Sequence, residues 1–305
     1  SIHTCRRPFV HIIVHTSALH LDMLMGRLSA AAAALCLLSS STGGKAATTM
    51  EFNTECSYQS PWTSNVGRHH LPQGTQLSEA SLLDVLNAVY EGHAENASWM
   101  GLDAKMAAAE HQGDELPEDV YVYGEIHPIS VIRMLACVQS KPGARYYDLG
   151  SGTGKTVIVA SLLGWNASGI EAVARRSAAA EAAADRLHSM ALASSGSSGN
   201  SNFPGGLANV IAPTFIQGSF LDIDFSDADV LFANSVLFTE EMMEDLAHVA
   251  AGMRPGSLIV SYRTFLGERF SRVGDFSGPV TWQKDFFTWA IQRVEAPRRQ
   301  SDEEL

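Results

Sequence analysis

The sequence predicts a doubly wound α/β fold with a mainly parallel sheet, preceded by an N-terminal helical segment. Short apolar segments typical of strands alternate with longer segments whose apolar residues recur at helical spacing. The first strand-like segment leads into a glycine-rich turn, Asp148-Leu-Gly-Ser-Gly-Thr-Gly154, and the second ends in Glu171, 23 positions after Asp148. Alternating strands and helices place neighbouring strands parallel in one sheet.

The predicted elements begin with two helices, in which apolar residues recur at helical spacing between Leu77 and Tyr90 and between His127 and Val138. The later helices are expected at Lys155–Leu163, Ala172–Ala193 and Glu240–Met253. The expected parallel strands are Ala144–Tyr147, Ala167–Ile170, Val210–Gln217, Asp229–Ala233 and Leu258–Tyr262. Val280–Phe286 and Thr288–Val294 are expected to form an antiparallel edge hairpin.

The chain divides into four predicted parts. Residues 1–65 are expected to be a disordered leader or targeting segment, because Leu28–Leu38 is an apolar stretch of signal-peptide length. This stretch is too short to cross a bilayer, so no membrane span is expected in the mature chain. Residues 66–140 form the N-terminal helical segment, 141–296 the ligand-binding domain, with a Ser/Gly-rich loop at 194–206, and 297–305 a charged tail.

The glycine-rich turn does not fit a phosphate-binding loop. Such a loop reads G-x-x-x-x-G-K-[ST], which would place a glycine where the sequence has Leu149. The carboxylate of Asp148 would also repel a polyphosphate. The turn therefore fits a cationic or neutral ligand, which the backbone of Gly150, Gly152 and Gly154 lets approach closely.

Glu171 stands where a ribose-binding acid is expected. A carboxylate about 20 residues past the glycine turn accepts hydrogen bonds from ribose hydroxyls. A dinucleotide-binding fold is the alternative, but it requires G-x-G-x-x-G, whereas this turn reads G-x-G-x-G. The turn and the acid together resemble the first motifs of class I methyltransferases, Rossmann-like proteins that bind S-adenosyl-L-methionine at the carboxyl ends of their strands.

Further motifs narrow this resemblance. In chain order they are Val122-Tyr-Gly-Glu125, the glycine turn, Gly218-Ser-Phe-Leu-Asp222, Val230-Leu-Phe-Ala-Asn-Ser-Val-Leu-Phe238 and Gly256-Ser-Leu-Ile-Val-Ser261. Over residues 115–266 the chain resembles the disruptor-of-telomeric-silencing family, the histone H3 lysine-79 methyltransferases that lack a SET domain. The resemblance implies a seven-stranded sheet, S-adenosyl-L-methionine as cofactor, histone H3 in nucleosomes as protein substrate, and a nuclear location. A functional leader would instead direct the chain to an organelle or the secretory route.

The resemblance also implies roles for individual residues. Most are candidate cofactor contacts: Tyr123, Gly124 and Glu125 in a loop over the cofactor, Asp148, Gly150, Ser151, Gly152 and Gly154 beside its methionine part, Glu171 at the ribose, and Phe220 on the adenine. Asn234 matches a polar residue of the methyl-transfer channel and contacts the cofactor, and Phe238 matches the channel wall. Asn234 and Tyr123 are the candidate catalytic residues.

Two positions depart from the family pattern. Lys155 stands where the family often has Gln, and Ser219 where it usually has Asp. Both count as candidate cofactor contacts, although the Lys155 side chain is expected to cap the helix end or face solvent. Ser binds the adenine amino group more weakly than Asp does, and Asp222 is a candidate to compensate.

Composition limits the partners. The net charge is −12, and no run of Lys or Arg indicates a nucleic-acid-binding face, the pairs Arg175-Arg176 and Arg298-Arg299 being expected at the solvated surface. The four cysteines are scattered and His69-His70 has no matching ligand pair, so no metal site is predicted. Two alternatives stay open: a class I methyltransferase acting on a non-histone protein or a small molecule, and a non-catalytic binding module on the same fold.

Overall fold

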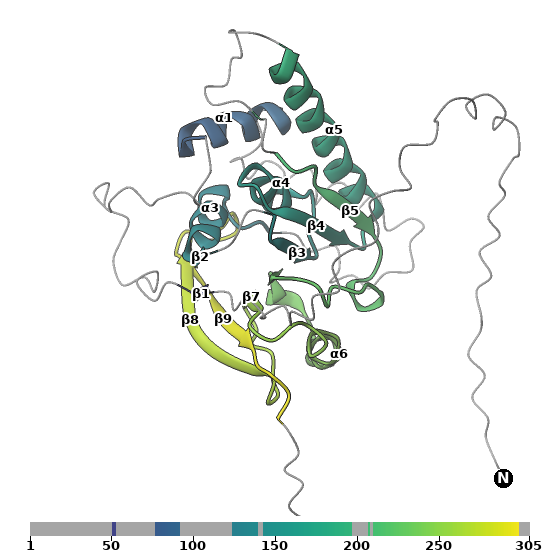
Figure 1. Cartoon of the computed structure of the whole chain (residues 1–305), viewed down its shortest axis with the longest axis vertical. Helices are drawn as coiled ribbons and strands as arrows, with labels where there is room; N and C mark the ends of the chain where they lie inside the picture. The colour runs from purple at the N-terminus through teal and green to yellow at the C-terminus, as the bar shows by residue number, and fades with distance from the viewer. Residues whose placement is uncertain are drawn as a thin grey trace, which may run out of the picture. The chain divides into compact units, whose positions relative to one another are not determined.

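A seven-stranded sheet organises the fold (Figure 1). Its strands lie in the order β5-β4-β3-β6-β7-β9-β8. Neighbours from β5 to β7 are parallel, and β9 runs antiparallel to both β7 and β8. The strands are β3 (Arg145–Leu149), β4 (Asn166–Glu171), β5 (Thr214–Gln217), β6 (Val230–Ala233), β7 (Leu258–Ser261), β8 (Phe270–Gly278) and β9 (Phe287–Val294). The predicted doubly wound, mainly parallel sheet is confirmed.

The structure is a computed structural model, which describes residues 51–52, 77–91, 124–139, 143–196, 207 and 210–298. A second, two-stranded sheet pairs β1 (Glu51–Phe52) with β2 (Val138–Gln139), so that part of the predicted leader is in a strand. The rest of the predicted leader and residues 197–206 of the predicted loop lie outside the described residues. None of the described helices is long and apolar enough to cross a membrane.

Four helices cover one face of the sheet (Figure 1): α1 (Glu79–Val89), α3 (Pro128–Cys137), α4 (Lys155–Leu162) and α5 (Ala174–Gly196). Side chains alternate between the faces of a strand, so Val230 and Phe232 of β6 pack among these helices. The intervening residues Leu231 and Ala233 enter a second core on the other face. All four residues are buried, as strands covered on both faces require.

The second face carries α6 (Glu240–Ala250) and two 3₁₀ turns, η3 (Phe220–Asp222) and η4 (Ser235–Leu237). The Thr239 side chain caps α6 by accepting a hydrogen bond from the Met242 backbone N–H at 3.1 Å. Met243, Leu246 and Ala250 recur at helical spacing and form the buried stripe of α6. This sequence pattern explains both where α6 begins and which side faces the sheet.

One strand of the predicted edge hairpin was placed wrongly. The hairpin exists, but its first strand is β8 at Phe270–Gly278, and not Val280–Phe286. Val280 forms only an isolated bridge with Ile126. The β8 sequence FSRVGDFSG contains two glycines and four short or charged polar residues, which hide the alternating pattern of a strand. The register shift between Arg272 and Gly274 interrupts that alternation further.

We predict that Gly154→Ala lowers the free energy of unfolding by about 3 kcal/mol, because a Cβ atom would overpack the core at a residue with positive φ. That Cβ would lie 2.5 Å from Phe215 Cζ, and the Gly154 φ is +82°. Gly164 is the matched control, since its φ is +84° and no atom lies within 4 Å of its Cβ position. Gly164→Ala should lower the free energy of unfolding by only about 1 kcal/mol. Urea denaturation of both variants and the wild type measures these changes. Equal losses in the two variants would contradict the packing argument.

Candidate functional site

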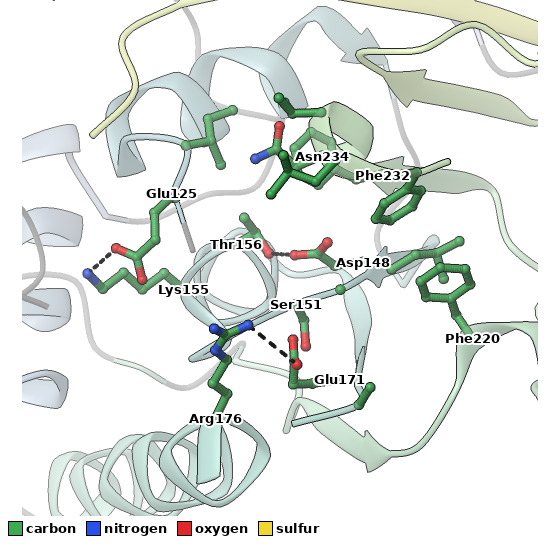
Figure 2. A pocket seen from close by; sticks show the side chains of 18 of the residues that line it. Glu125, Asp148, Ser151, Lys155, Thr156, Glu171, Arg176, Phe220, Phe232 and Asn234 are labelled. Carbon is green, nitrogen blue, oxygen red and sulfur yellow. Dashed lines mark hydrogen bonds and ion pairs between the residues drawn. The ribbon is translucent and has the colours of Figure 1, made fainter. Parts of the chain in front are cut away.

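A cavity of about 480 Å³ lies at the carboxyl ends of β3, β4 and β6 (Figure 2). Parallel α/β sheets bind ligands at this edge, where the strand order reverses direction. The reversal falls at β3, which has β4 on one side and β6 on the other. The lining residues come from the glycine turn, α4, the start of α5, the two 3₁₀ turns, and the segments around residues 125 and 282.

The glycine turn is tied to the end of β4. The backbone N–H groups of Gly150 and Ser151 both donate to the Ile170 carbonyl, at 2.9 and 3.0 Å. Gly150, Gly152 and Gly154 all have positive φ, which side chains other than glycine rarely adopt. Gly150 lines the cavity, and a Cβ there would point to within 3.9 Å of Phe238.

Asp148 is the last but one residue of β3, and only 2% of its surface is exposed. Burial raises the pKa of its carboxyl from 3.8 to about 7, the hydrogen bond from the Thr156 hydroxyl lowers it, and nearby Glu171 raises it further. Asp148 is therefore close to the midpoint of its titration at neutral pH. A cation bound in the cavity would favour the charged carboxylate.

Glu171 is held in one orientation by backbone donors. Its Oε2 accepts from Gly152 N–H at 2.8 Å and its Oε1 from Val173 N–H at 2.9 Å. Burial raises the pKa of Glu171, while these backbone bonds and Arg176 lower it. Glu171 thus joins the glycine turn to β4 as well as lining the cavity.

Lys155 is not at the surface, contrary to the expectation. Only 4% of it is exposed, and its Nζ pairs with Glu125 Oε2 at 2.6 Å (Figure 2). Glu125 Oε1 accepts a second bond, from the Thr153 hydroxyl, at 3.0 Å. Tyr90, which caps the end of α1, completes this cluster, because its ring centre lies 5.5 Å from Lys155 Nζ and its hydroxyl donates to the Thr153 carbonyl. Burial, followed by the charge of Glu125, raises the pKa of Tyr90.

Two segments that are far apart in the sequence form the cover of the cavity next to Glu125. Ile126 bridges Val280, Thr281 N–H donates to the Glu125 carbonyl at 2.9 Å, and His127 N–H donates to Pro279. Gly124 lies so close to Trp282 that a Cβ there would be 2.5 Å from the indole. We call residues 124–127 and 279–282 together the roof strip.

Aromatic rings form another wall of the cavity. Phe220 and Phe238 stack with their ring centres 5.1 Å apart, so each packs on the other as well as on the cavity. The Ser219 hydroxyl accepts from Leu221 N–H at 3.2 Å and caps η3. Asp222 is exposed and does not line the cavity, so it does not take the place of an acid at Ser219.

Asn234 follows β6 and contacts an aromatic residue of β9. Its Oδ1 accepts from the Trp289 indole N–H at 3.2 Å. This bond fixes the amide plane and turns the Asn234 oxygen toward Trp289, with the amide nitrogen on the opposite side. Trp289 is completely buried among Phe232, Phe276 and Phe287, so Asn234 is held by a rigid partner.

Most of the predicted site residues meet at this cavity: Gly124, Glu125, Asp148, Gly150, Ser151, Lys155, Glu171, Ser219, Phe220 and Asn234. Gly152 and Gly154 shape the turn without lining the cavity. Tyr123 lies outside the described residues. The individual roles of all these residues stay predictions.

Several lining residues were not predicted, including Thr156, Arg176, Phe232 and Trp282. Arg176 was expected at the surface, yet it is buried beside Glu171. The sequence could have indicated Thr156 as a cavity residue, because the first turn of the helix that follows the glycine turn must face Asp148. No local sequence pattern indicates Trp282 as a cavity residue, since only the pairing of the two halves of the roof strip brings it to the cavity. No group of three metal-ligating side chains occurs among the described residues.

The comparison with known families agrees with this geometry. The family model described as "Histone methylation protein DOT1" matches residues 117–278, more than half of the 305-residue chain. The chain belongs to the DOT1 family. The matched segment contains every predicted site residue.

Curated DOT1 relatives are much longer than the matched part. A "Histone-lysine N-methyltransferase, H3 lysine-79 specific" from Debaryomyces hansenii is 27% identical over 217 residues, which cover 70% of this chain and 17% of the relative. One of the same description from Yarrowia lipolytica is 24% identical over 57% of this chain and 37% of the relative. Among solved structures, magnesium protoporphyrin IX methyltransferase from Synechocystis, with bound S-adenosylmethionine, is 14% identical over 71% of this chain and 97% of that one, with a TM-score of 0.39.

We predict that Asp148→Asn stabilises this DOT1-family chain at alkaline pH. The folded pKa of Asp148, about 7, exceeds its ordinary value of 3.8, so the native state holds a proton that the unfolded state has released. Stability therefore falls as pH rises between these values and stays lower above pH 7. At pH 8.5 the free energy of unfolding of the variant should exceed that of the wild type by about 2 kcal/mol, after subtraction of the cost of burying the Asn amide. This difference between the two proteins should shrink toward pH 4. A pH-independent difference in denaturant titrations would contradict this origin.

We also predict that Lys155→Met costs about 3 kcal/mol of stability, because it leaves Glu125 buried without its cation. Adding Glu125→Gln to that variant should restore most of the loss, which a double-mutant cycle measures. The control is Arg298→Met, whose partner Glu268 is 3.6 Å away in a pair with side chains 81% and 71% exposed. That variant should change stability by less than about 0.5 kcal/mol. Additive effects at Lys155 and Glu125 would show that their contact does not matter.

Proposed function

We propose that this chain binds S-adenosyl-L-methionine and transfers its methyl group to a lysine of histone H3 in nucleosomes. The observation that carries the proposal is that the motif residues of the DOT1 family gather around one cavity. The names of the curated relatives supply the acceptor. The catalytic domain would comprise residues 141–296 together with the preceding helical segment, and its location would be the nucleus.

The cavity residues fit the proposed cofactor. The Ser151 hydroxyl is buried, lines the cavity and has no hydrogen-bond partner among the described residues, so it offers a polar contact. The lack of a side chain at Gly150 leaves room for the ligand beside Phe238. Asp148 suits a cationic group, because a positive charge nearby lowers the cost of its ionisation. Glu171 would accept from the ribose, and Phe220 would pack on the adenine.

The cofactor, when bound, supplies a methyl group that a sulfonium has already activated. The chain's own task is to align the acceptor amine and exclude water. Asn234 is suited to the first, since the Trp289 bond fixes its amide, but an amide is not basic enough to remove the lysine proton. The roof strip, through Gly124 and Trp282, is suited to the second.

The charge next to the cavity favours a basic protein over a nucleic acid as the acceptor. Met242 of α6 lines the cavity, and the exposed side of the same helix carries Glu240, Glu241, Glu244 and Asp245. Such a surface attracts basic polypeptides, including histones, and repels phosphate backbones. A basic non-histone protein is therefore the second candidate for the methyl acceptor.

The test is a tritium-transfer assay with the full chain and S-adenosyl-L-methionine, on nucleosomes and on free histones. We expect label on H3 in nucleosomes, and none when the lysine named for the relatives is replaced by arginine. Asn234→Ala should lower kcat at least about tenfold through loss of alignment, and by a larger factor than it weakens binding of S-adenosylhomocysteine. Arg298→Met serves as the activity control, because Arg298 is exposed and does not line the cavity.

The remaining outcomes separate the alternatives. Calorimetric binding of S-adenosylhomocysteine without label on any histone would leave a methyltransferase with another acceptor. Neither label nor binding by the folded chain would leave a non-catalytic module.

A further inference from the structure

Arg176 is a buried cation beside the proposed ribose acid. It belongs to the first turn of α5, has 6% of its surface exposed and lines the cavity. Its Nη1 lies 4.0 Å from Glu171 Oε1, and Figure 2 shows the guanidinium reaching from α5 toward this carboxylate. The neighbouring Arg175 is exposed, so the two adjacent arginines have different surroundings.

The position of Arg176 carries two electrostatic costs. The amino end of a helix carries partial positive charge, which repels a cation in the first turn. Burial adds the cost of removing the guanidinium from water. The carboxylate of Glu171 offsets both, but at 4.0 Å the two groups are too far apart for a direct hydrogen bond.

The gap between the two groups matches a hydroxyl oxygen. An oxygen about 2.8 Å from both Nη1 and Oε1 forms a triangle with their 4.0 Å separation, and both contacts are normal hydrogen bonds. A hydroxyl donates one hydrogen bond and accepts others, so it can donate to a carboxylate and accept from a guanidinium at once. Glu171 is already oriented for this, because Gly152 and Val173 hold its two oxygens.

We propose that Arg176 and Glu171 together form a receptor for a ribose hydroxyl of the cofactor, in which the hydroxyl donates to Glu171 and accepts from Arg176. This inference rests on the proposed function, since it takes an adenosyl cofactor as the ligand. Arg176 is then a specificity-determining residue, and the site selects ribose over deoxyribose. A ligand without the hydroxyl leaves a buried carboxylate and a buried guanidinium without the atom that joins them.

The experiment compares ligands and variants in one calorimetric cycle. The ligands are S-adenosylhomocysteine and its 2′-deoxy and 3′-deoxy analogues, and the proteins are the full-length wild type, Arg176→Met, Arg176→Lys and the matched control Arg175→Met. Met keeps the apolar stem of Arg but not its donors. Thermal unfolding checks each variant, and Arg176→Gln replaces Arg176→Met if the latter does not fold.

We expect the wild type and Arg175→Met to prefer S-adenosylhomocysteine over at least one deoxy analogue by about 30-fold or more. Arg176→Met should reduce this preference about tenfold by weakening the ribose ligand selectively, and Arg176→Lys should retain part of it. Equal weakening of ribose and deoxyribose ligands in Arg176→Met would overturn the inference and leave Arg176 a structural partner of Glu171. If the folded wild type binds none of the three ligands, the cofactor assignment itself fails.

Discussion

The hydrogen bonds that join the glycine turn to β4 are the constraint on which the site depends. The Ile170 carbonyl accepts from Gly150 and Ser151, and Glu171 accepts from Gly152, so the ends of β3 and β4 are locked together. This arrangement needs positive φ in the turn, which the glycines provide. It fixes where α4 begins, and therefore where Lys155 and Thr156 point.

Buried charges then connect this rigid centre to the rest of the chain. Lys155 links α4 to Glu125, and Arg176 links α5 to Glu171. Each cation is buried next to an acid in the lining of the cavity, where loss of the partner charge would be strongly destabilising. The pairs therefore specify which segments meet at the cavity, while the apolar stripes of the helices supply most of the stability.

The residues at the centre of the cavity are those that local sequence patterns single out. Asp148, the glycines and Glu171 depend on one turn and two strand ends, so their spacing carries the information. Features that depend on tertiary pairing could not be read in the same way. Trp282 reaches the cavity only because Ile126 and Val280 pair across more than 150 residues, and β8 is hidden by its glycines. The sequence predicts Arg176 at the surface and Lys155 as a helix cap or in solvent, because nothing local shows which neighbours cover a charged residue at a helix start.

The roof strip has a consequence for how this protein can be divided. One half precedes β3 in the sequence and the other follows β8, and each supplies the other with backbone hydrogen bonds. The hairpin of β8 and β9 holds the later half in place, although the family match ends at residue 278. A fragment with an intact cavity therefore has to begin before Gly124 and to include β9, which ends at Val294. Its boundaries are set by the antiparallel end of the sheet, and not by the motifs that identify the family.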